Sequence, residues 1–129
     1  MGTGYTDSHA RKGIDAKHPK LDVFPNQFPG TKIRIKALEY TSVCPKTGLP
    51  DHGSITLTYV PDAKCIELKS LKFYLLSYRN LGIFYENAVN CVLRDVVKAT
   101  DPLSAKVVGR MSVRGGIKTT VTVRYSRPG

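Results

Sequence analysis

The sequence predicts an α+β fold, an antiparallel sheet with helices packed on one face. Two observations support this fold class. Apolar and polar residues alternate in two segments before residue 61, which is the period of half-buried strands, and two more strands are predicted after residue 104. Between these pairs, apolar residues recur every three or four positions in two longer segments, as in amphipathic helices.

Residues 1–20 are polar and basic and contain several glycines, so we expect a flexible N-terminal arm that a neighbouring subunit could order. His9 and His18 are isolated in this arm and are expected to be solvated. The rest of the chain, residues 21–129, has room for one domain. It begins with an extended apolar segment over residues 21–30.

A β-hairpin is predicted next. Residues 32–40 alternate isoleucine and alanine with lysine and arginine, and residues 54–60 place Ile55, Leu57 and Tyr59 on one face. The segment between these strands is rich in proline and glycine and is expected to be a tight loop. A short strand over residues 64–67 follows the hairpin.

Two helices and two strands complete the pattern. The helices are predicted over residues 68–80 and 85–99, and the strands over residues 105–113 and 117–125. The expected apolar stripe of the first helix consists of Leu68, Leu71, Leu75 and Tyr78, and that of the second consists of Ala88 or Val89, Val92, Leu93 and Val96.

The chain is strongly basic, with 20 Lys and Arg against 10 Asp and Glu and a formal net charge of +10. Such an excess is typical of proteins that bind polyanions. Composition alone leaves three explanations open: a nucleic acid partner, a phosphate-rich cofactor, or a soluble surface that happens to be basic.

Other features of the composition limit the environment of the protein. No apolar run approaches the roughly 18 residues of a membrane span, and the first residues lack the apolar core of a signal peptide. The three cysteines are an odd number without CxxC spacing, which argues against a disulfide framework and against a zinc site. We therefore expect a cytoplasmic protein without a metal.

The most informative segment is the loop over residues 41–51. Cys44 is followed seven positions later by Asp51, and Pro45, Gly48 and Pro50 lie between them. A tight loop of this length can bring the thiol and the carboxyl close together. A thiolate beside a proton donor can attack a polarised carbon and protonate the product. From the loop alone, a buried structural cysteine and a turn aspartate remain the alternative.

Three later segments add to the loop: the run ELKSLKFY over residues 67–74, Glu86 at a helix start, and the RGG sequence over residues 114–116. In this order and spacing the chain resembles the single-module 7-cyano-7-deazaguanine reductases of queuosine biosynthesis, from about residue 21 to residue 125. The resemblance implies the tunnelling fold, in which such units join edge to edge into a barrel. It also implies a homodecamer of two stacked pentamers with active sites between subunits.

The resemblance implies a reaction for the loop. Cys44 matches the cysteine that adds to a nitrile and forms a thioimide, and Asp51 matches the proton donor for the imide nitrogen. An acid must hold its proton near neutral pH, so we expect burial to raise the pKa of Asp51. Lys46 or a cation of the cofactor site is expected to lower the pKa of Cys44.

The resemblance also implies the binding residues. NADPH is the expected cofactor, with no dinucleotide-binding glycine fingerprint, and cations three residues apart on a helix suit its phosphates. A carboxylate at a helix start suits the guanine-like edge of the substrate. The expected cofactor contacts are Lys69, Ser70, Lys72, Arg114 and Gly115, with Gly116 also permitting close approach. The expected substrate contacts are Glu86, Tyr85, Glu67 and Leu68.

The sequence departs from the family pattern at two positions. Tyr85 stands where the family often has histidine; a phenol can still donate a hydrogen bond but cannot become a cation near neutral pH. His52 stands where we expect an apolar aromatic residue, and we expect it to substitute for that residue in the core. Cys65 and Cys91 match no functional position and are expected to be structural.

The sequence therefore predicts an NADPH-dependent nitrile oxidoreductase that reduces 7-cyano-7-deazaguanine to the 7-aminomethyl base, with no membrane partner and no direct nucleic acid partner. Two alternatives remain open. One is an archaeosine-type relative that adds ammonia to the nitrile in tRNA and forms an amidine. The other is a basic RNA-binding module without catalysis, which would favour exposed aromatic residues on a strand.

Overall fold

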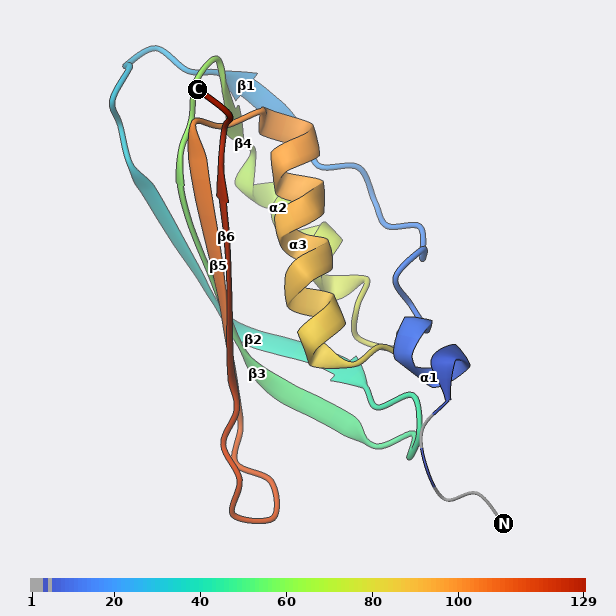
Figure 1. The fold of residues 1–129 in the computed structure, drawn as a ribbon. Helices are drawn as coiled ribbons and strands as arrows, with labels where there is room; N and C mark the ends of the chain where they lie inside the picture. The colour runs from blue at the N-terminus through green and yellow to red at the C-terminus, as the bar shows by residue number, and fades with distance from the viewer. Residues whose placement is uncertain (1–3, 5) are drawn as a thin grey trace.

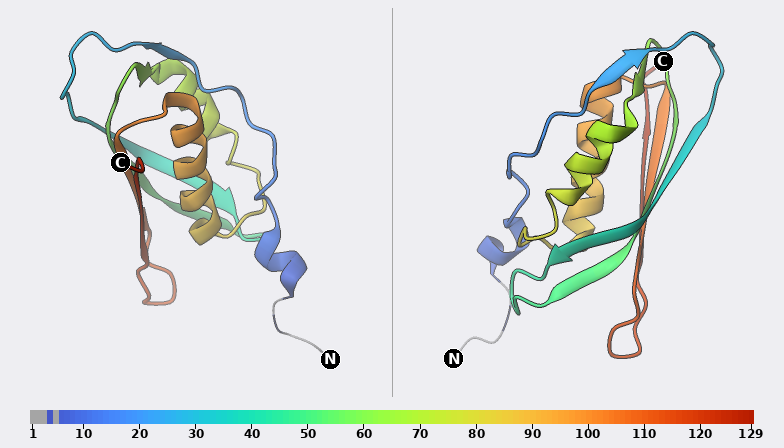
Figure 2. Two further views of the ribbon diagram at one scale, coloured as in Figure 1. Left: turned by 45° about the horizontal axis from the view of Figure 1, so that its top comes forward. Right: turned by 180° about the vertical axis from the view of Figure 1, so that it is seen from behind.

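The computed structural model describes residue 4 and residues 6–129, and it confirms an α+β fold with antiparallel sheets (Figure 1). The main sheet has four antiparallel strands in the order β2-β3-β5-β6, and a separate two-stranded sheet pairs β1 with β4. Both long helices lie on the same face of the main sheet (Figure 2). The strands are β1 (Val23–Pro25), β2 (Ile33–Val43), β3 (Pro50–Val60), β4 (Lys64–Ile66), β5 (Ser104–Met111) and β6 (Thr120–Ser126). The helices are α1 (Asp7–Arg11), α2 (Leu68–Leu76) and α3 (Tyr85–Thr100).

The predicted hairpin is formed by β2 and β3, but its strands are longer than expected. Pairing continues through Ser42 opposite Asp51 and Val43 opposite Pro50, so the connection spans residues 44–49 rather than 41–51. Proline is tolerated at Pro50 because it is the first residue of its strand. Asp51 therefore lies on a paired strand, which fixes its backbone more firmly than a loop would.

Helix α2 corrects two expectations. It ends at Leu76 rather than at residue 80, because the chain continues in tight turns such as the hydrogen bond from Arg79 N–H to Leu76 C=O. Its buried face also differs: Leu68 is 61% exposed, whereas Tyr74 is 2% exposed. The buried pair Leu71 and Tyr74 sets the rotation of the helix, with Tyr78 buried in the turn that follows, and this rotation turns Leu68 outward.

The core lies between the helices and the main sheet. Ile55, Leu57 and Tyr59 are buried on the inner face of β3, as predicted. Helix α3 matches its predicted range to within one residue and buries Val89, Val92 and Val96 against them. Cys65 and Cys91 are also buried, as expected for structural cysteines.

The N-terminal segment lies against its own chain. Asn87 donates to the carbonyl oxygen of Ala10 at 2.6 Å, and Arg94 donates to that of Ile14 at 3.1 Å. The expectation that His18 is solvated is wrong, because its ring stacks on Tyr78 at a centroid distance of 4.3 Å. Burial lowers the pKa of His18. The mobility of this arm stays a prediction.

Candidate active site

A cavity of about 500 Å³ lies where the residue 44–49 loop, the start of α3 and the β5–β6 hairpin meet. Five of the predicted site residues line it together: Cys44, Asp51, Tyr85, Glu86 and Arg114. These residues come from three separate segments of the sequence, so the fold brings the nucleophile, the acid and the candidate substrate contacts into one cavity.

The loop that carries Cys44 is held at both sides. Within the loop, Cys44 N–H donates to Leu49 C=O and Gly48 N–H donates to Cys44 C=O, each at 2.9 Å. Gly48 has a φ of 74°, a conformation that favours glycine. Val43 exchanges hydrogen bonds of 2.9 and 3.0 Å with Leu81 and Ile83. These bonds fix the thiol next to the start of α3.

The environment of Cys44 favours its thiolate. Burial alone would raise the pKa of Cys44, but hydrogen bonds from the Thr47 hydroxyl and from the backbone N–H groups of Thr47 and Lys46 lower it below its ordinary value. Lys46 thus acts through its backbone, while its Nζ donates to the carbonyl oxygen of Gly4 at 3.3 Å. Three converging donors stabilise a charge on sulfur.

Asp51 is buried at the cavity wall, and its pKa is raised as predicted. Burial is the largest cause; the Arg114 guanidinium opposes it, the Glu86 carboxylate adds to it, and His52 opposes it. A carboxyl that keeps its proton to higher pH than usual is suited to donate that proton near a nucleophile.

Arg114 is bound to Asp51 in this chain. Its Nη1 lies 2.7 Å from Asp51 Oδ1, and its Nη2 donates to the carbonyl oxygen of Pro50 at 2.7 Å. Gly115 and Gly116 have φ values of 58° and 77°, so glycine is needed here for the turn conformation. Among the described residues, no heavy atom beyond the neighbouring positions lies within 4 Å of where a Cβ would stand on either glycine, so the space beside the turn is open there.

The first turn of α3 supplies the other cavity residues. The Tyr85 hydroxyl donates to Thr119 Oγ1 at 3.3 Å, and Glu86 is exposed in the first helical turn, where the helix dipole favours an anion. Sequence reasoning missed Thr119 and Met111, which also line the cavity. No motif marks them; the β3–β5 register places Met111 opposite Gly53, and Met111 N–H in turn donates to Thr119 C=O at 3.0 Å.

The predicted cofactor run forms the start of α2. The Glu67 carboxylate caps the helix by accepting from the N–H groups of Lys69 and Ser70 at 2.8 Å each, and these bonds lower its pKa. The Ser70 hydroxyl is buried, donates to Glu67 C=O and accepts from Asp22 N–H. Lys69 and Lys72 are exposed. Glu67 and Ser70 therefore fix the helix start, which leaves the two lysines available.

The α2 run does not line the Cys44 cavity. In Figure 1, α2 begins beside β4 at one end of the molecule, whereas the β2–β3 connection that carries Cys44 is at the opposite end. One chain therefore brings together Cys44, Asp51, Tyr85, Glu86 and Arg114, and holds Glu67, Leu68, Lys69, Ser70 and Lys72 apart from them.

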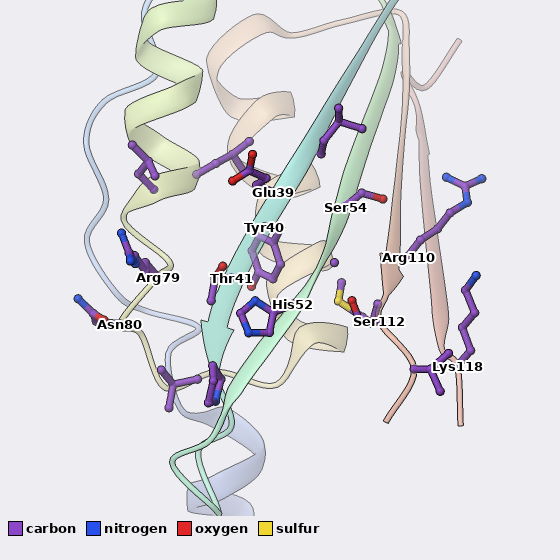
Figure 3. A pocket seen from close by; sticks show the side chains of 18 of the residues that line it. Glu39, Tyr40, Thr41, His52, Ser54, Arg79, Asn80, Arg110, Ser112 and Lys118 are labelled. Carbon is purple, nitrogen blue, oxygen red and sulfur yellow. The ribbon is translucent and has the colours of Figure 1, made fainter. Parts of the chain in front are cut away.

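A larger, open groove of about 980 Å³ crosses β2, β3 and β5 (Figure 3). His52, Arg79, Arg110 and Lys118 line it, and Cys44 and Asp51 do not. The larger groove is thus not the place where the nucleophile and the acid meet. His52 is exposed here, so the expectation that it fills the core is wrong: it alternates with buried Asp51 and faces the other side of β3.

Comparison with known proteins places this chain in a family. The family model described as QueF-like protein matches residues 50–129. A protein of Elusimicrobium minutum is 53% identical over 125 residues, 96% of this chain and 95% of that protein, and one of Chlorobaculum parvum is 56% identical over 108 residues, 82% and 93%. Both are named NADPH-dependent 7-cyano-7-deazaguanine reductase. The chain belongs to this QueF-like family.

A solved structure agrees with the fold of this QueF-like chain. The crystal structure of an archaeosine synthase QueF-Like in the apo form superposes with a TM-score of 0.72 and 24% identity, covering 80% of this chain and all of the other. In the part of the chain that the structure describes, no helix is long and apolar enough to span a membrane. Within the same residues, no cluster of three His, Cys, Asp or Glu is arranged to hold a metal ion.

Proposed function

We propose that this chain is an NADPH-dependent reductase that converts the nitrile of 7-cyano-7-deazaguanine to an aminomethyl group. The observation that carries the proposal is the cavity that joins Cys44, Asp51 and Glu86 in a chain 53% identical to a named reductase along 96% of its length. The reductase relatives are far more similar than the archaeosine synthase at 24% identity, so the amidine-forming reaction is not favoured.

The proposed reaction begins at the loop. The Cys44 thiolate adds to the nitrile carbon, and Asp51 gives its proton to the nitrile nitrogen, which yields a neutral thioimide. When bound, NADPH would supply two hydrides, the first to the thioimide carbon and the second to the carbon of the imine left when the C–S bond breaks, and the nitrogen takes its second proton from water with the second hydride. The C–S bond breaks between the two reductions, which returns the Cys44 thiolate. Asp51 recovers its proton from water before the next turnover.

The cavity can also hold the base. The Glu86 carboxylate accepts hydrogen bonds from the ring N–H and the exocyclic amine of a guanine-like edge. The Tyr85 hydroxyl, which donates to Thr119 in this structure, can donate instead to the ring carbonyl. Glu67 and the backbone at Leu68 complete the pocket from a neighbouring subunit.

A second copy of the chain explains why the site residues lie at two ends of one molecule. In residue 4 and residues 6–129, no further strand pairs with the outer edges of β2 and β6, and these edges suit the edge-to-edge joining of a tunnelling fold. In the proposed homodecamer of two pentamers, α2 of one subunit approaches the Cys44 cavity of the next. Lys69 and Lys72 then hold the NADPH phosphates. The proposed enzyme is cytoplasmic and acts on the free base without direct contact with nucleic acid.

The test of this function follows NADPH oxidation with the free nitrile base as substrate. We expect two NADPH consumed for each nitrile reduced, because a nitrile and an amine differ by four electrons. Ammonia incorporation into nitrile-bearing tRNA without NADPH oxidation would instead favour the amidine-forming enzyme. Tight tRNA binding with no adduct on Cys44 would favour an RNA-binding module and overturn the proposal.

The assignment of the lysines gives a separate prediction. Replacing both Lys69 and Lys72 with glutamine is expected to raise the KM for NADPH by about tenfold or more, because two charge-assisted phosphate contacts are lost. Thioimide formation without NADPH should be unchanged. The matched control is Lys98→Gln, which removes an exposed lysine from α3. An unchanged KM in the double variant would remove these lysines from the cofactor site.

A further inference from the structure

The ion pair between Arg114 and Asp51 is unusual for a proton donor. The guanidinium donates hydrogen bonds of 2.7 Å each to Asp51 Oδ1 and to the Pro50 carbonyl oxygen. The Asp51 side chain is 8% exposed, whereas that of Arg114 is 54% exposed. The acid is therefore fixed in the cavity wall, and the cation that contacts it lies near solvent.

The pair opposes the reaction proposed for this site. A carboxyl that donates a proton must be protonated, and a guanidinium at hydrogen-bond distance favours the ionised form. Other titratable groups interact with Asp51 through their charges: Glu86 at the start of α3, His52 on the same strand, and Cys44 and Tyr40 across β2 and its loop. Removing the Arg114 contact would thus shift Asp51 toward its protonated form.

The backbone of Arg114 is held independently of its side chain. It begins the tight turn that joins β5 to β6, and the turn is closed by a mutual pair of 2.9 Å backbone hydrogen bonds between Arg114 and Ile117. The side chain could exchange its partners while this backbone remains in place. In the proposed enzyme, the same arginine is a contact for the nucleotide, whose phosphates compete with Asp51 for the guanidinium.

We propose that Arg114 is a positioning residue that lowers the protonated fraction of Asp51 in the empty enzyme and releases Asp51 when a nucleotide phosphate takes the guanidinium. Asp51 then takes up a proton from water and can donate it to the nitrile nitrogen. The inference rests on the proposed function and adds a coupling between the two sites: nucleotide binding prepares the acid.

The test measures thioimide formation without hydride transfer, by absorbance and by intact mass, with the nitrile base and no NADPH. At fixed pH, a higher Asp51 pKa means a larger protonated fraction, so Arg114→Gln is expected to form the adduct about two- to fivefold faster than the wild type. Oxidised NADP⁺, which cannot donate hydride, should accelerate the wild type and have no effect on Arg114→Gln. Turnover with NADPH should show a raised KM in the same variant.

Two further variants serve as controls. Arg110→Gln removes an exposed arginine from β5 of the same hairpin, and it should retain both the wild-type rate and the response to NADP⁺. Arg114→Lys keeps the charge but lacks the planar guanidinium that donates to two oxygens at once. Its rate of adduct formation should therefore fall between those of the wild type and Arg114→Gln. Thermal melting confirms that the variants are folded.

If Arg114→Gln forms the adduct no faster than the wild type and still responds to NADP⁺, the inference is overturned and Arg114 acts in cofactor binding alone. The proposed reductase function would still stand in that case. A wild-type enzyme that forms no adduct at all would overturn the proposed function, and this inference with it.

Discussion

Replacing Cys44 with alanine is expected to abolish the covalent adduct with the nitrile and to lower turnover by at least about 10⁴-fold, as for other enzymes that lose their nucleophile. The hydrogen bonds that favour the thiolate then have no sulfur to act on. Intact mass spectrometry after incubation with the nitrile base, together with NADPH oxidation, measures both effects. The substrate should still bind, because Glu86 and Tyr85 remain in the cavity.

The matched control for this variant is Cys65→Ala. Cys65 is 4% exposed on β4, outside the Cys44 cavity, so its loss should affect stability and leave the adduct intact. An adduct mass that persists in Cys44→Ala would assign the nucleophile to another residue. An adduct that disappears in Cys65→Ala, with folding retained, would contradict the structural role of that cysteine.

The long helices and strands were largely predictable because their apolar residues follow a clear period. The alternation of Ile55, Leu57 and Tyr59 placed the inner face of β3, and the 3.6-residue stripe placed α3 to within one residue. The predictions were wrong where tertiary contacts determine the strand bounds and the rotation of a helix. Pro50 and Asp51 pair with β2 and so belong to the sheet rather than to the loop. Tyr74 packs into the core, and α2 therefore has a different rotation from the one that its leucines predict.

The candidate site was predictable in its residue types and not in its arrangement. Cys44 and Asp51 were close in sequence, so a hairpin was enough to bring them together. The contact between Asp51 and Arg114 joins residues 63 positions apart and depends on the β3–β5–β6 order, which no local pattern encodes. The distance between α2 and the cavity also follows from the topology alone.

Replacing Asp51 with asparagine is expected to lower kcat by about 10²- to 10⁴-fold while leaving substrate binding largely unchanged, because the amide has the same shape but carries no acidic proton. The amide oxygen can still accept the hydrogen bond from Arg114 Nη1, so the hairpin tip should stay in place.

The pH dependence of this variant separates an acid from a structural carboxylate. In the wild type, burial raises the pKa of Asp51, so Asp51 stays protonated to a higher pH than an ordinary carboxyl. The protonated fraction of Asp51 falls as the pH rises through that pKa. The rate of thioimide formation in Asp51→Asn should lose this pH dependence and keep only the pH dependence that ionisation of Cys44 contributes.

The matched control is Asp62→Asn, which changes an exposed carboxylate paired with Arg127 and should keep the wild-type pH profile. Turnover that is unchanged in Asp51→Asn would contradict its role as proton donor, and a slow variant with an unchanged pH profile would make Asp51 a structural residue of the cavity.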